Sequence, residues 1–287
     1  MAALNIDGRE LAKRLEGQLR SSVSELAARN GISPCLAIVL VGENPLSTGY
    51  VRSKKKRAED CGILVREFRL RTDSSQEEVN SQLQTLSGDA SVHGILLQLP
   101  LPPHLNELEA LLCIRPAADI DGLHPYNQGL LLRGLPCPLP CTAKACLLLI
   151  QEARELLGFG KSLSGCHAVV VGRSSLVGKP TAMLLLSEGC TVTLCHSQTL
   201  NLQDQTRQAD ILVSAAGSPN LITRESVKPG AIVIDVGITQ IRSGKIAGDV
   251  DTAAVAEMAG AITPVPGGVG PMTIAALLSN VVAAAGI

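Results

Sequence analysis

The sequence predicts an α/β protein that contains two α/β domains. Short runs rich in Val, Ile and Leu alternate with helical stretches along the chain, a pattern typical of mostly parallel sheets joined by helices. The apolar residues in runs such as CLAIVLVG and CHAVVVG are continuous rather than alternating, so these strands are expected to be covered on both faces. A length of 287 residues is enough for two domains, each with its own core.

Seven runs are expected to form strands, at residues 35–42, 62–70, 92–99, 166–172, 190–196, 210–216 and 231–237. Between the third and fourth runs, from residue 116 to residue 140, the chain is rich in Pro and Gly, which indicates a linker. We therefore expect a first domain at 1–139, completed by a C-terminal helix at 268–287, and a second domain at 140–267. A cleft is expected between the two.

The overall composition argues against several classes of partner. With 25 Lys+Arg and 26 Asp+Glu the net charge is −1, so no global field attracts nucleic acid or an anionic membrane. Two Tyr, two Phe and no Trp are too few for base-stacking platforms. No apolar run reaches the roughly 20 residues of a membrane helix, and the N-terminus predicts a short extended segment and an amphipathic helix rather than a targeting sequence. We expect a cytoplasmic protein with no nucleic-acid or membrane partner.

The nine cysteines are scattered and form no CxxC pair, which favours a reducing compartment. Cys137, Cys141 and Cys146 lie close together in the sequence, but no His or second cysteine pair completes a tetrahedral set of metal ligands. We expect them to be apolar filler and expect no metal.

The stretch YVRSKKKRAEDCG, residues 50–62, has five basic side chains within six positions. Asn44 is a good N-cap, Pro45 suits the first helical position, and Gly62 is a good helix stop. The sequence therefore predicts a helix over residues 45–61.

One of the five basic residues lies on the apolar side of this helix. At 100° per residue, Lys54 projects about 40° from Tyr50, within an arc that also contains Val51, Ala58 and Cys61. Its stem can pack while the ammonium reaches water, which is the ordinary arrangement of a lysine. Alternatively, burial lowers the pKa of the amine and lets it move protons near neutral pH. The phenol of Tyr50, one turn earlier, favours this second interpretation.

Two further polar residues stand beside apolar segments. Gln98 ends an expected strand that Pro100 terminates, at the edge where open α/β folds bind ligands; a simple strand cap is the alternative. Asp119 and Asp121 lie in the turn DIDG, in which Gly122 permits the chain reversal. Turn formation alone explains an Asp beside a Gly, and the open question is whether Asp121 also reaches a ligand.

The segment VVVGRSSLVGKP follows a strand and opens a helix, so the loop at Gly172 presents backbone N–H groups and a helix N-terminus to a phosphate. Ser174 replaces the second glycine of the usual GxGxxG pattern. The next strand ends in CHS, without the acid that holds an unmodified ribose, while Arg173 and Ser197 can donate to a 2′-phosphate. We therefore expect a Rossmann-like domain that binds NADP rather than NAD; a merely solvated Arg173 is the alternative.

The segment PVPGGVGPMT has three glycines within residues 267–270, followed by Pro271 at an expected helix start. Such a loop can approach a ligand closely, and we expect it to face one. A plain tight turn is the alternative.

Taken together, YVRSK, HGILLQLPLP, DIDGLHPYN, VVVGRSSLVGKP, DVGI and PVPGGVGPMT resemble the bifunctional methylenetetrahydrofolate dehydrogenase/methenyltetrahydrofolate cyclohydrolase family, the FolD type. The resemblance covers nearly the whole chain in the family's order. It implies a two-domain α/β homodimer, with the active site in a cleft between a catalytic domain and a Rossmann-like NADP-binding domain.

The resemblance also implies the chemistry. 5,10-Methylenetetrahydrofolate passes a hydride from its one-carbon bridge to NADP⁺, and water then opens the methenyl cation to 10-formyltetrahydrofolate. No metal is required, because the cation is already electrophilic and the protein supplies positioning and proton transfer.

By the same resemblance, Lys54 matches the catalytic lysine that activates water, and Gln98 matches the residue that contacts and tunes it. Tyr50 matches the tyrosine that stacks on the folate, and Asp121 the acid that binds the pterin edge. The implied NADP contacts are Gly172, Arg173, Ser174, Ser197 and Ile238. The other residues expected to bind the folate are Leu99, Pro100, Pro264, Gly267 and Gly268.

Three segments depart from the family pattern. Ala143 and Ala145 replace the proline and glycine of PCTPxG at the domain junction, where hinge stiffness is expected to change. Leu130 stands where an Arg commonly follows YNxG, and Leu46 with Gly49 is expected to loosen the helix that carries Lys54. None of these departures touches Lys54, Gln98 or Asp121.

Two other functions are compatible with a two-domain cleft. One is an enzyme of a different kind, either a dehydrogenase that lacks cyclohydrolase activity or a shikimate-dehydrogenase-like NADP oxidoreductase. The other is a nucleotide- or folate-binding protein without catalysis, against which the set of Tyr50, Lys54, Gln98 and Asp121 argues.

Overall fold

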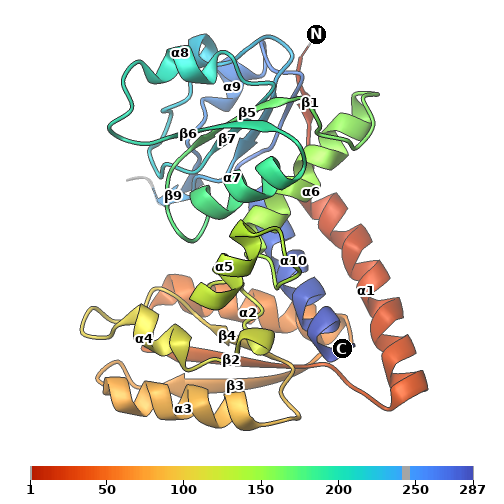
Figure 1. Ribbon diagram of the computed structural model, residues 1–287, viewed down its shortest axis with the longest axis vertical. Coiled ribbons are helices and arrows are strands. Elements are labelled where there is room, and N and C mark those ends of the chain that lie inside the picture. Colours follow the sequence, from red (N-terminus) through yellow and green to blue (C-terminus); the bar gives the residue numbers. More distant parts are fainter. Residues whose placement is uncertain (1, 241–245, 287) are drawn as a thin grey trace. The chain divides into compact units, whose positions relative to one another are not determined.

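The structure is a computed structural model that describes residues 2–240 and 246–286, with the side chains of residues 45–47 left out. The contacts within the chain group it into two compact units. One consists of Arg14–Cys141 and Ile274–Ile287, and the other of Met1–Lys13 and Thr142–Thr273. Figure 1 shows a parallel sheet flanked by helices in each unit.

A three-stranded parallel sheet forms the centre of the unit that contains Lys54. Its strands are β2 (Cys35–Val41), β3 (Leu64–Leu70) and β4 (Gly94–Leu97), in the order β3-β2-β4. Every residue of the central strand β2 is buried. This confirms the prediction, from continuous apolarity, that both faces of the strand are covered.

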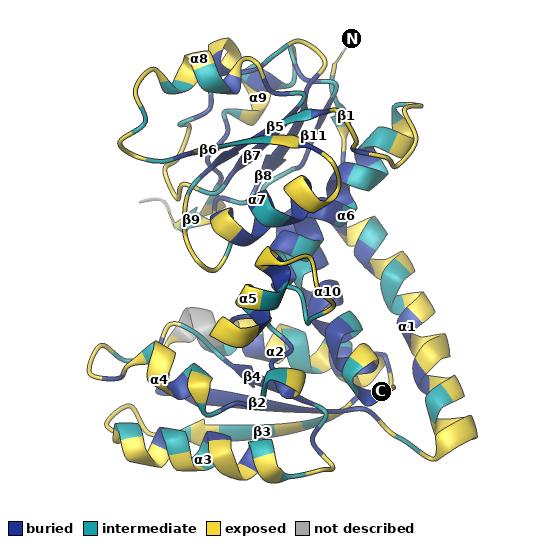
Figure 2. Ribbon diagram, in the orientation of Figure 1, coloured by how far each residue is buried: buried dark blue, intermediate teal, exposed yellow. Residues whose placement is uncertain are grey.

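The two faces of β2 belong to separate cores. Its even-numbered residues from 36 to 40 pack with α1 (Gly8–Asn30), α2 (Pro45–Asp60) and α10 (Val269–Ala285). Its odd-numbered residues from 37 to 41 pack with α3 (Gln76–Gly88) and α4 (Glu107–Leu112). The sheet is therefore a middle layer between two helical layers, and Figure 2 shows the buried residues of this unit gathered at its centre.

Local sequence explains where these helices begin and end. Ser75 and Glu78 form a capping box at the start of α3, with the Ser75 hydroxyl accepting from Glu78 N–H at 3.2 Å and the Glu78 carboxylate accepting from Ser75 N–H at 2.9 Å. Gly62 has a φ of +81° just after α2, which suits the glycine predicted to stop that helix. Two short elements complete the unit, the 3₁₀ helix η1 (Pro116–Ala118) and α5 (Pro125–Leu132).

The other unit is built on a six-stranded parallel sheet with the order β1-β11-β8-β7-β5-β6. Its strands are β1 (Leu4–Asn5), β5 (His167–Val171), β6 (Thr191–Cys195), β7 (Ile211–Ser214), β8 (Ile232–Asp235) and β11 (Ala261–Ile262). An antiparallel pair, β9 (Thr239–Gln240) and β10 (Ile246–Ala247), lies outside this sheet. All seven predicted strands are present, each within two residues of its predicted start.

The helices of this unit are α6 (Cys141–Leu156), α7 (Gly178–Ser187), α8 (Leu202–Thr206), α9 (Thr252–Val255) and the 3₁₀ helix η2 (Arg224–Ser226). Helix α7 packs on β5 and β6. Alternate residues of β5 and β7 face a core that also contains residues from the η2 and α9 region.

The strand order of this sheet contains a topological switch point. From β5 the chain adds β6 on one side and then returns to place β7 on the other side of β5. The connections therefore diverge between β5 and β7. In open α/β sheets, ligands bind beyond the carboxyl ends of the strands at such a topological switch point.

The contact-based units differ from the predicted domains at their ends. Residues 1–13 group with 142–273, because β1 pairs with β11. Helix α10 begins at Val269, and its residues from Ile274 onward group with the unit of the three-stranded sheet. The assignment of one domain to folate and the other to NADP remains a prediction.

All nine cysteines are free, and all but Cys113 and Cys137 are buried. Cys141 donates from its thiol to the Ile120 carbonyl at 3.2 Å. Within the described residues, no helix combines the length and the apolarity needed to cross a bilayer.

Candidate active site

Lys54 and Gln98 are joined by a hydrogen bond. Lys54, on α2, donates from Nζ to Oε1 of Gln98, which directly follows β4, at 3.0 Å. The other end of the amide is also fixed, because Nε2 donates to the Leu99 carbonyl at 2.6 Å. An ammonium can only donate hydrogen bonds, so the amide oxygen gives it a partner without adding a second charge. The predicted loss of the Lys54 proton near neutral pH stays a prediction.

The side of α2 that carries Lys54 is apolar, as the helical wheel predicts. Val51, Ala58 and Cys61 are at most 1% exposed, while Lys54 is half-buried at the edge of this face. Tyr50, one turn earlier, is 41% exposed. Its ring is therefore available to a flat ligand, and Lys54 is neither fully solvated nor sealed in the core.

The two acids of the DIDG turn have different environments. Asp119 is 1% exposed and accepts hydrogen bonds from Leu123 N at 3.2 Å, His124 N at 2.8 Å and Asn127 Nδ2 at 2.9 Å. Burial raises its pKa, although these three bonds oppose the shift. Asp121 is half-buried, and no hydrogen bond of its carboxylate is recorded among the described residues. Asp119 thus builds the turn, and a ligand contact of Asp121 stays a prediction.

The DIDG turn is held beside β4 from several directions. A parallel bridge joins Asp119 to Ile95 of β4, three residues before Gln98. Asn280 of α10 donates from Nδ2 to the Ile120 carbonyl at 2.8 Å. Gly122 has a φ of +69°, and a Cβ there would lie 2.5 Å from the Pro140 nitrogen. Only glycine suits this position, and the turn therefore has a fixed place next to the strand that precedes Gln98.

The loop after β5 is closed tightly around two glycines. A Cβ on Gly172 would lie 2.2 Å from the Ala215 carbonyl oxygen, and a Cβ on Gly178 would lie 1.9 Å from the Gly172 oxygen. Ser174 folds the loop from within, since its hydroxyl accepts from Val177 N at 3.1 Å and from Gly178 N at 3.4 Å. The loop leads directly into α7, where the Gly178 and Lys179 N–H groups are bonded to Ser174.

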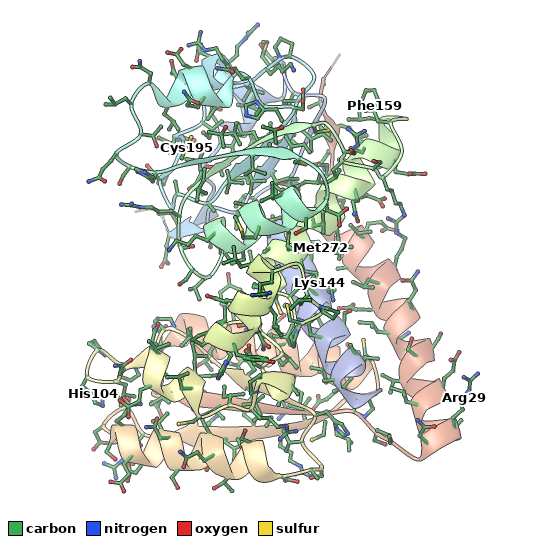
Figure 3. The ribbon with its side chains drawn as sticks, viewed as in Figure 1. Arg29, His104, Lys144, Phe159, Cys195 and Met272 are labelled. Atoms are coloured by element: carbon green, nitrogen blue, oxygen red, sulfur yellow. The ribbon has the colours of Figure 1, made fainter. Side chains whose placement is uncertain are left out.

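The carboxyl end of β6 carries no acid. Cys195, labelled in Figure 3, ends the strand, and a turn follows in which His196 N–H donates to the Thr199 hydroxyl at 2.8 Å. Ser197 and Arg173 are both exposed. A hydroxyl and a guanidinium without a carboxylate suit a 2′-phosphate. The tight glycine loop and this donor set therefore fit NADP.

Two buried carboxylates, which sequence reasoning did not single out, organise the loops beyond β7 and β8. Asp235 accepts from Gly237 N, Asp249 N and Val250 N at 2.9 to 3.0 Å. Asp249 accepts from Ser214 Oγ and from the N–H groups of residues 216, 217 and 218 at 2.7 to 3.2 Å. The sequence signal that could have revealed Asp235 is an acid at the end of an apolar strand, in AIVID. Ile238, in the segment DVGI that begins with Asp235, is 53% exposed.

The glycines of PVPGGVGP pack closely against neighbouring backbone, which is compatible with the tight-turn alternative. Gly267 and Gly268 are buried, and Gly268 N–H donates to the Pro264 carbonyl at 2.8 Å. A Cβ on Gly8 would lie 1.8 Å from the Gly268 oxygen, so the loop touches the start of α1. Whether Pro264 and these glycines also meet a ligand stays a prediction.

The departures from the family pattern are accommodated locally. Ala143 and Ala145 are fully buried in α6, which begins at Cys141 without the proline. Leu130 is half-buried on α5, and a Cβ on Gly49 would meet nothing within 4 Å. The side chain of Leu46 lies outside the described residues. Of the part of the chain that the structure describes, no group of three or more His, Cys, Asp or Glu side chains is placed to hold a metal.

The comparisons with known proteins agree in one family. The model of the tetrahydrofolate dehydrogenase/cyclohydrolase catalytic domain matches residues 6–121, and that of the tetrahydrofolate dehydrogenase/cyclohydrolase NAD(P)-binding domain matches residues 140–287. The bifunctional protein FolD 1/3 of Ruegeria pomeroyi is 50% identical over 99% of this chain and 95% of its own length.

Solved structures match over nearly the whole chain. The bifunctional FolD enzyme of Campylobacter jejuni is 44% identical with a TM-score of 0.94, covering 99% of each chain. The methylenetetrahydrofolate dehydrogenase-cyclohydrolase of Trypanosoma brucei, solved with NADP cofactor and an inhibitor, is 38% identical with a TM-score of 0.91, covering 99% of this chain and 97% of its own. On these matches and on the geometry above, the chain belongs to the tetrahydrofolate dehydrogenase/cyclohydrolase family.

Proposed function

We propose that this protein oxidises 5,10-methylenetetrahydrofolate with NADP⁺ and hydrolyses the resulting 5,10-methenyl form to 10-formyltetrahydrofolate. The observation that carries the proposal is the 3.0 Å bond between Lys54 and Gln98 in a chain of this family. An amine held at the carboxyl edge of a parallel sheet, with its partner amide fixed, is suited to proton transfer on a bound substrate.

Lys54 is the proposed proton carrier of the hydrolysis. Addition of water to the methenyl carbon forms a carbon–oxygen bond and releases one proton. Opening of the ring breaks the carbon–N5 bond, the hydroxyl gives up its proton as the formyl C=O forms, and N5 takes up a proton, so that one proton is released overall. Lys54 moves these protons, while Gln98 holds the amine in place through Oε1. Because Nε2 of Gln98 is engaged with Leu99, the amide cannot turn away from the amine without losing that second bond.

The remaining folate contacts are assigned on the same grounds. Tyr50 offers an exposed ring for stacking on the folate. The carboxylate of Asp121 accepts hydrogen bonds from the N–H groups at the pterin edge. Leu99, Pro100, Pro264, Gly267 and Gly268 are proposed to line the folate.

NADP⁺ is the proposed hydride acceptor. When bound, its nicotinamide supplies the redox chemistry of the first step. The loop at Gly172, together with Ser174, presents backbone donors to the pyrophosphate, and Arg173 and Ser197 hold the 2′-phosphate. Ile238, exposed after β8, is proposed to contact the cofactor.

We further propose a cytoplasmic homodimer whose partners are tetrahydrofolate derivatives rather than nucleic acid or membrane. The near-neutral net charge of −1 argues against nucleic acid and membrane as partners. Sedimentation of the purified protein as a monomer at micromolar concentration would contradict the homodimer.

The activity is tested with the purified wild-type protein. Reduction of NADP⁺ is followed spectroscopically with 5,10-methylenetetrahydrofolate, and hydrolysis is followed as loss of the methenyl absorbance. We expect both activities, and a kcat/KM for NADP⁺ at least about tenfold above that for NAD⁺, or ~1.4 kcal/mol. Dehydrogenase activity alone would support an enzyme without cyclohydrolase function, and folate binding without turnover would support a binding protein.

A further inference from the structure

We propose that Asp249 is a positioning residue for NADP binding, acting through the loop 215–218 that follows β7. The proposal rests on the proposed function, because it requires the glycine loop after β5 to bind NADP. Asp249 itself is fully buried. Its effect is exerted through the shape of the backbone at the switch point.

The loop 215–218 lies beside the glycine loop that follows β5. Strands β5 and β7 are neighbours, and their connections diverge, so the loops after them meet where a dinucleotide crosses the sheet. The two loops are in contact, since a Cβ on Gly172 would lie 2.2 Å from the oxygen and 2.8 Å from the carbonyl carbon of Ala215. A displacement of Ala215 would therefore open or block the loop at Gly172.

The carboxylate of Asp249 holds the loop 215–218. Oδ2 of Asp249 accepts from Ala216 N at 2.7 Å, Gly217 N at 3.2 Å and the Ser214 hydroxyl at 3.1 Å, and Oδ1 accepts from Ser218 N at 2.8 Å. Three successive amides are thus turned inward to one carboxylate. The amides of this loop are then unavailable to a phosphate, and the loop can offer a dinucleotide its carbonyl oxygens, which accept from ribose hydroxyls or the carboxamide.

Asp249 is in turn held by the carboxylate of Asp235. The carboxylate of Asp235, at the end of β8, accepts from the Asp249 and Val250 N–H groups at 2.9 and 3.0 Å. A Cβ on Gly237 would lie 2.3 Å from Asp249 Oδ1, and a Cβ on Gly248 would lie 2.0 Å from Asp235 Oδ2. Glycine at both positions therefore leaves room for two carboxylates in one enclosed site. The pair links the ends of β7 and β8.

The test measures NADP binding directly by isothermal titration calorimetry. Asp249→Asn keeps the size of the side chain but replaces one acceptor oxygen with a donor group, which faces the loop amides or Ser214. We expect the Kd for NADP to rise at least about tenfold, equivalent to ~1.4 kcal/mol. With NADP⁺ at saturation, we expect most of the kcat to return, because the folate site is untouched.

The matched control is Asp210→Asn. Asp210 also accepts a backbone bond, from His167 N at 2.9 Å, but at the amino end of β5, at the opposite edge of the same sheet. This variant is expected to lose stability and keep the wild-type Kd. A folded Asp249→Asn with a Kd within twofold of the wild type, or an equal rise in Asp210→Asn, would overturn the proposal.

If Asp249→Asn does not fold, Ser214→Ala provides the test, because it removes one of the four donors to Asp249 and leaves the carboxylate in place. Its Kd is expected to rise about two- to fivefold, and an unchanged Kd would overturn the proposal. Failure of the proposed function looks different, since the wild-type protein itself would then not bind NADP.

Discussion

The amide of Gln98 is the smallest feature on which the proposed chemistry depends. Its oxygen meets the amine of Lys54 and its nitrogen is tied to the Leu99 carbonyl. The amide oxygen is a neutral acceptor that adds no charge beside the amine, whereas a carboxylate in the same place would add a negative charge.

This difference predicts the behaviour of Gln98→Glu. The variant keeps an oxygen near Lys54 Nζ but adds a negative charge, so the amine should hold its proton to higher pH. We expect the pH–rate profile of methenyl hydrolysis to move to higher pH, with the rate near neutral pH reduced about tenfold or more. An unchanged profile would mean that the amine does not take part in the rate-limiting proton transfer.

Asp235 predicts a pH dependence of stability. Burial raises the pKa of Asp235 from 3.8 to about 6, although three backbone N–H bonds oppose the shift; the nearby Asp249 charge adds a smaller effect in the same direction as burial. Because the folded state holds this proton more tightly than the unfolded state, the contribution to stability is complete below about pH 4. It is lost as pH rises through 6, and it amounts to about 3 kcal/mol.

Urea unfolding at a series of pH values measures this contribution. The free energy of unfolding of the wild type, minus that of Asp235→Asn, should fall as pH rises from about 4 to about 7. A difference that stays constant or grows with pH would show that Asp235 is already ionised in the folded protein at low pH.

At the scale of single residues, sequence reasoning was strongest where a side chain breaks a pattern. Lys54 on an apolar arc and Gln98 at a strand end are both visible in the sequence, and the structure joins them. The pairing of Asp235 with Asp249 was not visible, because it depends on two loops that lie 14 residues apart in the chain and meet only in the fold.

At the scale of elements, the loop between β5 and α7 can close tightly only because it contains two glycines. Gly178 begins α7 with an ordinary negative φ, yet its Cα lies against the Gly172 carbonyl. The restriction is therefore one of space and not of backbone conformation.

Gly178→Ala is expected to push these backbones apart. Its Cβ would lie 1.9 Å from the Gly172 oxygen, so we expect a loss of stability of about 1–3 kcal/mol and a weaker binding of NADP. Gly17→Ala is the control, because a Cβ there meets nothing within 4 Å in the middle of α1. It should stabilise the protein by about 0.5–1 kcal/mol. Equal NADP affinity in both variants would contradict the role of this loop.

Elements with a strong local pattern were predicted, whereas the pairing of the short strands was not. The seven apolar runs are all strands, and the helix expected at 45–61 is α2. Strands β1 and β11 have two residues each and pair across most of the chain length, and a two-residue segment has no periodicity to detect.

At the scale of the whole molecule, alternation of strands and helices was sufficient to predict two α/β parts with parallel sheets. It was not sufficient to place the N-terminal residues, which join the sheet of the second half through β1. Pairing between distant short strands depends on the complete fold, and no local signal specifies it.

The central claim is that the amine of Lys54 carries the protons of methenyl hydrolysis. The most direct test compares the rate of methenyltetrahydrofolate hydrolysis by Lys54→Ala and by Lys55→Ala, whose neighbouring amine bonds to Glu67 instead. We predict that Lys54→Ala loses at least about a hundredfold of this rate with an unchanged Kd for NADP, while Lys55→Ala stays within about twofold of the wild type. Hydrolysis by Lys54→Ala at the wild-type rate would contradict the account.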